Sequence, residues 1–199
     1  MAQGFWNTLV TLAAPGTAIA ASSTRTSMTV GSTQARYTMP GNLLKMPGDQ
    51  LLVEASGIIS TVATTPGTET IDIALGTVAN CSTGAMTLNI TAQTNTPWYL
   101  RMLMTAFTVG AGTAAQLRFS GFWLSPASIL TPAGATGPGP GGQIVPYSGT
   151  ATGSSTLGAT FDSTISNLVD IYATSSITTA GSSIQLLQYS LSLLSATGF

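Results

Sequence analysis

Apolar and polar residues alternate with a period of two along most of this 199-residue chain. That period is typical of β-strands with one buried face. The alternating runs are residues 24–30, 50–59, 69–75, 86–91, 97–109, 113–124 and 187–193. In the run 97–109, the residues expected to face the core are Trp98, Leu100, Met102 and Met104, and those of the other face are Tyr99, Arg101, Leu103 and Phe107. The pattern therefore predicts an all-β protein.

Turn-forming residues separate the runs, as a sheet protein requires. They are Pro47-Gly48-Asp49, Pro66-Gly67, Ser82-Thr83-Gly84 and Gly110-Ala111-Gly112. The last of these lies between the two longest runs and predicts a tight hairpin. Evidence for helix is confined to Ile165, Leu168, Val169 and Tyr172, which fit a period of 3.6. Their β-branched and Ser/Thr-rich surroundings favour a strand instead.

Residues 126–146 interrupt the pattern with five of the ten prolines and several glycines, which predicts a loop or linker. About six strands precede this segment and two or three follow it. The roughly 50 residues beyond it would form a marginal domain alone. We therefore expect residues 23–199 to form one β-sandwich of jelly-roll or Greek-key type with about eight strands, in which 126–146 is a surface crossover. Residues 1–22 are expected to form an extended N-terminal arm, in which 6–12 could add a strand.

The composition excludes most chemistry and most nucleic-acid roles. Charged residues make up 6% of the chain, against about 25% in an ordinary soluble domain. The five basic residues are scattered, whereas nucleic-acid binding needs several cations along the phosphates. With no histidine and with Cys81 as the single cysteine, His-dependent triads and His- or Cys-based metal sites cannot form. We expect no catalytic, cofactor-binding or metal-binding residues.

Carboxylates acting in pairs are the remaining route to hydrolysis. The candidate pairs are Asp49 with Glu54, Glu69 with Asp72, and Asp162 with Asp170. The favoured interpretation is that all six residues form turns or occupy solvated strand positions, because sheets commonly have a polar outward face. A hydrolase is therefore the third hypothesis for this chain.

Aromatic residues suggest either a core or a binding surface. Trp98 and Trp123 share strand faces with Leu, Met or Phe, which favours core packing over a sugar-binding platform. Trp6 lies in the weakly patterned arm and could either anchor an interface or pack on its own sandwich. Phe5 and Trp6, together with the outward-phase Arg101 and Arg118, are the candidate assembly contacts, although solvation is the default for the two arginines.

The N-terminal segment 5–20 is fairly apolar and carries Ala18-Ile19-Ala20. It lacks the basic residues of a signal peptide and is interrupted by polar residues, Pro and Gly, so a signal peptide is not favoured. No stretch reaches the length of about 20 apolar residues that a membrane-spanning helix needs. We expect no membrane partner.

The order of these features resembles a known family. The segment 39–61, with its Gly48-Asp49-Gln50-Leu51-Leu52-Val53-Glu54-Ala55-Ser56-Gly57 strand, and its continuation 71–76 resemble the opening of jelly-roll structural proteins of tailed-phage virions. The stretches 97–100, 108–113, 161–162 and 183–194 are also similar, whereas 126–146 departs from the family pattern. The resemblance implies a role on the virion surface, commonly as homotrimers, and carries no catalytic residues.

Three hypotheses follow. The leading one is a virion structural protein, made in the host cytoplasm. It would be a capsid decoration (cement) or minor capsid protein that stabilises the shell by contacts with its own copies and with major capsid or other virion proteins. The alternative is a phage tail or fibre component, or a carbohydrate-binding β-sandwich module, which acts in host recognition. That alternative predicts an exposed Trp or Tyr in a concave site. An enzyme is the least favoured.

Overall fold

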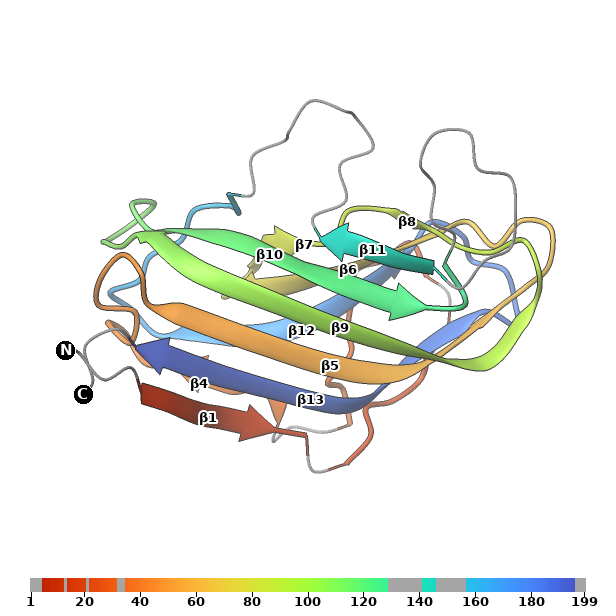
Figure 1. The fold of residues 1–199 in the computed structure, drawn as a ribbon, viewed down its shortest axis with the longest axis horizontal. Coiled ribbons are helices and arrows are strands. Elements are labelled where there is room, and N and C mark those ends of the chain that lie inside the picture. Colours follow the sequence, from red (N-terminus) through yellow and green to blue (C-terminus); the bar gives the residue numbers. More distant parts are fainter. Residues whose placement is uncertain are drawn as a thin grey trace.

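The computed structural model describes residues 5–12, 14–20, 22–31, 35–128, 141–145 and 157–195, and for Phe5 and 141–145 it describes the backbone. Within these ranges the chain forms thirteen β-strands in two antiparallel sheets (Figure 1). No helix in this part of the chain is long and apolar enough to cross a membrane. The predicted all-β sandwich is confirmed.

The larger sheet has seven strands and faces the viewer in Figure 1. Its order is β1 (Phe5–Thr11), β13 (Ser183–Ser195), β5 (Gln50–Thr61), β9 (Gln93–Thr108), β10 (Gln116–Ser125) and β11 (Gly141–Val145), and the short β2 (Ile19–Ala20) also pairs with β13. β9 and β10 form the predicted hairpin around the glycine-containing turn 110–112. The N-terminal strand, predicted at 6–12, is the edge strand β1.

The smaller sheet has six strands and lies behind the larger one. Its order is β3 (Thr26–Ser27), β12 (Asn167–Ser175), β6 (Thr68–Leu75) and β7 (Val78–Ser82). β4 (Tyr37–Met39) extends the edge next to β12, and β8 (Met86–Thr87) pairs with β6. Strands adjacent in the sequence, such as β5 and β6 or β12 and β13, lie in different sheets, so the chain crosses between layers repeatedly.

The core lies between the inner faces of the two sheets. Leu100, Met102 and Met104 of β9 are fully buried there, as the alternation predicted. Trp98 and Trp123 stack on each other with ring centroids 4.9 Å apart and are 2% and 0% exposed. The core interpretation of both tryptophans is confirmed, so they form no sugar-binding platform.

In the predicted run 187–193, Tyr189, Leu191 and Leu193 are buried as the alternation predicted, and a β-bulge corrects the phase of Leu187 alone. The pairing of β13 with β5 shifts register between Leu186 and Gln188. Leu186 is therefore fully buried, while Leu187, which the alternation assigned to the core, is only half-buried. A bulge places two residues opposite one, so strict alternation across it fails.

Three segments differ from their predicted structure. Residues 24–30 form only the two-residue β3 followed by a turn, and Ile90, predicted to face the core, is 63% exposed. Residues 141–145, within the predicted loop 126–146, form the strand β11 beside β10. Residues 129–140 and 146 of that loop lie outside the described residues. Finally, thirteen strands replace the predicted eight or so, because several two- or three-residue strands carry little sequence signal.

Candidate functional site

The side chains of the larger sheet that point away from the core form one broad surface, here called the outer face. Strand register sets these side chains in rows across the sheet. The rows are Trp6–Leu194–Gln50–Thr105–Arg118, Thr8–Ser192–Leu52–Leu103–Ser120, Thr11–Ser190–Glu54–Arg101–Phe122 and Gln188–Ser56–Tyr99–Leu124. Residues far apart in the sequence therefore meet on this surface.

One part of the outer face is apolar. A hollow of about 230 Å³ is lined by Leu52, Arg101, Leu103, Ser120, Gly121 and Phe122. Leu52 lies between Ser192 and Leu103 and is only 2% exposed, whereas Leu124 is 48% exposed. The solvated face of an antiparallel sheet is usually polar, and an exposed apolar patch is typical of an interaction surface.

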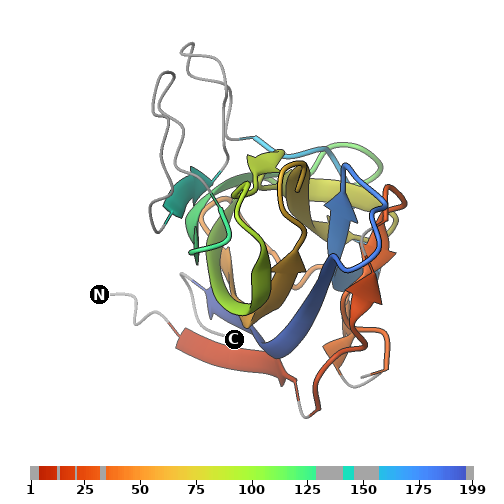
Figure 2. The same ribbon diagram turned by 90° about the vertical axis from the view of Figure 1, so that its right-hand side faces the viewer.

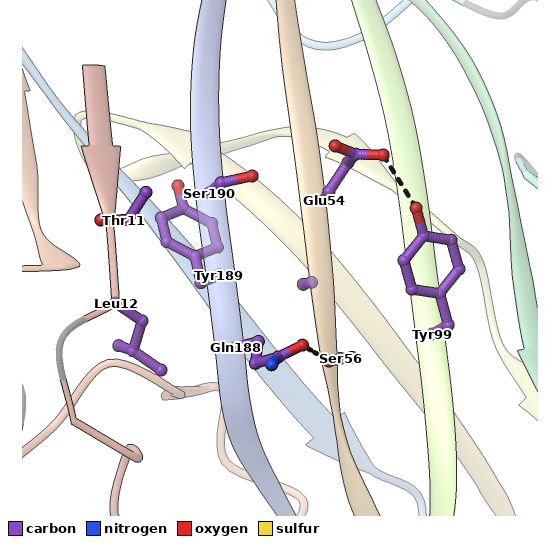
Figure 3. A pocket seen from close by; sticks show the side chains of 9 residues that line it. Thr11, Leu12, Glu54, Ser56, Tyr99, Gln188, Tyr189 and Ser190 are labelled. Carbon is purple, nitrogen blue, oxygen red and sulfur yellow. Dashed lines mark hydrogen bonds between the residues drawn. The ribbon is translucent and has the colours of Figure 1, made fainter. Parts of the chain in front are cut away.

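A polar groove of about 380 Å³ lies next to this apolar part (Figure 3). The groove lies where β13 bulges against β5. Residues of β13, β5 and β9 line it, together with the last residue of β1 and the residue that follows it. The lining residues are Thr11, Leu12, Glu54, Ala55, Ser56, Tyr99, Gln188, Tyr189 and Ser190. The small side chains of Ser56 and Ser190 on the outer face leave space between their larger neighbours.

Hydrogen bonds hold the polar side chains of the groove in place. The Tyr99 hydroxyl donates to Glu54 Oε1 at 2.8 Å, and the Ser56 hydroxyl donates to Gln188 Oε1 at 3.1 Å (Figure 3). Partial burial raises the pKa of Tyr99, and the hydrogen bond to Glu54 raises it further. Arg101 Nε lies 3.7 Å from Glu54 Oε1, with both side chains partly exposed. The groove therefore offers a carboxylate, an amide and hydroxyls to one ligand, and Arg101, which lines the neighbouring hollow, pairs with its carboxylate.

An aromatic pair borders this polar groove. The rings of Tyr99 and Phe122 lie 5.9 Å apart at an angle of 41°. Tyr99 is half-buried, so part of its ring remains accessible. An aromatic surface beside hydrogen-bonding groups suits a ligand that has both apolar and polar faces.

The outer face contains three of the four predicted contact residues. Trp6 is 57% exposed at the β1 edge, Arg101 pairs with Glu54, and the Arg118 guanidinium lies 5.3 Å from the centre of the Phe107 ring. Phe5 lies opposite Ser195 in the β1–β13 ladder, and its side chain is outside the described residues. The two arginines do lie on the outward phase, as predicted.

The groove was missed from the sequence, although its signal was present. The alternation identified Tyr99 and Leu103 only as members of the second face of the run 97–109; Tyr99 lines the groove and Leu103 the apolar hollow beside it. Gln188 could not be linked to Ser56, because 132 residues separate the two.

Two of the six candidate carboxylates are turn-formers, as predicted. Asp49 Oδ2 accepts hydrogen bonds from the backbone N–H groups of Lys45 and Met46. Asp162 accepts from the backbone N–H of Gly112 and of Thr164, and the Thr164 hydroxyl and these N–H groups lower the pKa of Asp162.

Three other carboxylates are buried, which corrects the prediction of solvated positions. Asp72 does point to the outside of the smaller sheet, but Arg25 covers it, with Nε 2.9 and 3.0 Å from its two oxygens. Asp170 is fully buried and accepts from the Thr29 hydroxyl at 2.7 Å. Glu69 is 2% exposed and faces inward. Each binds its own partner, and no group of three or more Asp, Glu or Cys able to hold a metal occurs among the described residues.

Comparisons with known proteins give little further information. No family model matches the chain, and no curated protein matches it. Among solved structures, the CBM2 module of the evolved Dit of Lactobacillus casei BL23 phage J-1 matches at a TM-score of 0.37 and 9% identity, covering 99% of each chain. The function of this chain must therefore follow from its own residues.

Proposed function

We propose that this chain is a structural protein of a tailed-phage virion, a capsid decoration or minor capsid protein at the virion surface, and that it attaches through its outer face. The observation that carries the proposal is the apolar part of that face, where Leu103, Phe122 and Leu124 keep accessible surface on the side of the sheet that solvent would make polar. The sequence resemblance to jelly-roll virion proteins supplies the setting.

The physical basis is burial of apolar surface against a neighbour. Fully burying one Leu or Phe side chain stabilises a contact by about 1.5–3 kcal/mol. The low charge of the chain also suits close packing, because few charged groups would lose their hydration in the interface. Binding to an assembled shell then stabilises that shell by mass action, since each bound copy favours the assembled state.

A pair of matched variants tests this proposal. Leu124→Asp places a charge on the outer face, while Val78→Asp makes a comparable change on β7 of the smaller sheet; the two side chains are 48% and 45% exposed. Purified protein is added to particles that lack this chain, and its occupancy is measured after sedimentation. We expect Leu124→Asp to lower occupancy at least about tenfold and Val78→Asp to leave it unchanged. Equal occupancy for both variants would refute attachment through the outer face.

The polar groove favours a second candidate function, the binding of a carbohydrate in host recognition. Its hydroxyl, amide and carboxylate groups match the hydroxyls of a sugar, and the exposed part of the Tyr99 ring could contact a sugar's apolar face. This function requires an exposed Trp or Tyr in a concave site; Tyr99 is half-buried in the groove lining and meets that requirement in part, whereas Trp98 and Trp123 lie in the core.

A glycan array followed by calorimetry on the strongest binder tests the second function. Tyr99→Ala removes the aromatic border of the groove, and Phe107→Ala is its control, because Phe107 lies on the same face of β9 outside the groove lining. Affinity lost in Tyr99→Ala and retained in Phe107→Ala would support this function. An array without any binder would count against it.

A further inference from the structure

We propose that β1 is a site of strand addition, at which it pairs antiparallel with β1 of a second copy of this chain. The larger sheet would then continue across a two-fold axis. The inference rests on the proposed assembly role, but it concerns the edge of the sheet and a different partner from the one bound by the outer face.

Within the described part of the chain, half of the backbone groups of β1 have no strand partner. β1 pairs with β13 on one side, and Figures 1 and 2 show it at the margin of the sandwich with no described strand beyond it. Along an edge strand, successive residues direct their backbone N–H and C=O groups alternately to the neighbouring strand and to the open side. An uncovered edge of this kind is a template for another strand.

Other edges in the described part of the sandwich are shorter or covered. β3 and β4 have two and three residues. β7 has five residues, and the segment at Ala159 covers it: Asn80 Nδ2 donates to the Ala159 carbonyl at 3.1 Å, and the Ala159 N–H donates to the Asn80 carbonyl at 3.2 Å. β1 has seven residues and no comparable cover in the described hydrogen bonds.

The sequence of β1 contains neither a charged residue nor a proline, the usual protections against edge pairing. Its residues, Phe-Trp-Asn-Thr-Leu-Val-Thr, are mostly good strand formers. One bulge, between Thr8 and Val10, is the single irregularity in its pairing with β13. Trp6, Asn7 and Thr8 are all exposed. β1 is thus an edge that remains competent to pair.

Charge considerations favour a second copy as the partner. A two-fold contact brings each segment against the identical segment of the other subunit, so any charge on the strand would oppose its own kind. β1 carries none, and the exposed Trp6 of each copy would add aromatic contact area near the axis.

Sedimentation equilibrium of the full-length chain tests the pairing. Thr8→Lys introduces a charge at the edge, and Ser120→Lys is the matched control, since Ser120 is an exposed residue in the same row of the outer face but on β10, inside the sheet. We expect the unmodified chain and Ser120→Lys to form dimers, with the dimer dissociation constant of Thr8→Lys raised at least about tenfold. A monomeric unmodified chain, a trimer, or equal dimerisation of both variants would overturn the inference.

Disulfide trapping provides a second measurement, which does not require the fold to tolerate a lysine in β1. In a two-fold antiparallel pair, only the residue on the axis lies opposite its own copy and within disulfide range. In a Cys81→Ser background, a single cysteine is therefore placed at each position of β1 in turn, and the variant with its cysteine on the axis should form a cross-linked dimer under mild oxidation. Ser120→Cys should not cross-link. Failure of every β1 position to cross-link would overturn the pairing.

The two proposals fail separately. Thr8→Lys protein that is monomeric but still occupies particles would leave attachment through the outer face intact. Leu124→Asp protein that dimerises but does not occupy particles would leave the edge pairing intact.

Discussion

Glu69 makes a quantitative prediction about stability and pH. Its side chain is 2% exposed; Oε2 accepts a hydrogen bond from the Ser175 hydroxyl at 2.6 Å, and the buried Oε1 has no hydrogen-bond partner in the described structure. Burial raises the pKa of Glu69 from 4.5 to about 7, against the smaller opposing effect of the Ser175 hydrogen bond. The folded chain therefore holds this proton more tightly than the unfolded chain does.

The sign and size of the effect follow from proton linkage. The stabilisation from this group is complete below about pH 4.5 and is lost as the pH rises toward 7. Each pH unit within that window corresponds to about 1.4 kcal/mol, so the whole window amounts to about 3 kcal/mol. Glu69→Gln keeps the shape of the side chain and removes the titration. Its stability relative to the unmodified chain should therefore rise by about 3 kcal/mol between pH 4.5 and pH 8.

Urea unfolding at several pH values, followed by the fluorescence of the buried Trp98 and Trp123, measures this difference. Glu54→Gln makes the same chemical change on the outer face, where the side chain is 39% exposed, and controls for the loss of one carboxylate. A stability difference between Glu69→Gln and the unmodified chain that stays constant from pH 4.5 to pH 8 would refute the reasoning.

Three further substitutions test the packing, each by urea unfolding. Arg25→Met leaves the buried Asp72 without its partner and should cost about 2–3 kcal/mol, less than a fully buried pair because Arg25 is 31% exposed; adding Asp72→Asn should restore part of the loss. Gly57→Ala would place a Cβ against the Gln185 carbonyl and 2.8 Å from the Trp98 ring, so a loss of roughly 1–3 kcal/mol or more is expected. Trp98→Ala removes half of the tryptophan stack and should cost about 3–5 kcal/mol; a loss under 1 kcal/mol in any of the three would contradict the packing described.

Local pattern was enough to predict the strands and much of the core. The alternation in 97–109 and 113–124 correctly separated Trp98 and Trp123 from Arg101 and Arg118. It could do so because side chains of a strand point alternately to its two faces, whatever the strand pairs with. The Gly-Ala-Gly turn likewise acts over a few residues, and the hairpin it predicted is present.

Burial on the outside of a sheet needed the tertiary structure. The alternation placed Asp72 on the outward side correctly, but Arg25, 47 residues earlier in the chain, covers it. The buried position of Leu186 in place of Leu187 depends on a bulge against β5, which neither strand's own sequence encodes. The burial of Asp72 and that of Leu186 both depend on which segments pack together. The periodicity within one segment does not specify its partner.

The sequence by itself therefore determined an all-β sandwich of low charge without histidine chemistry, because composition and period are local properties. Only the tertiary structure decided where a partner could bind. The groove joins Glu54, Tyr99 and Gln188 across three strands. The edge at β1 arises because β13, from the far end of the chain, pairs with one side of it, while no described strand pairs with the other. Register and sheet order set these neighbours, and both are fixed by contacts between residues distant in sequence.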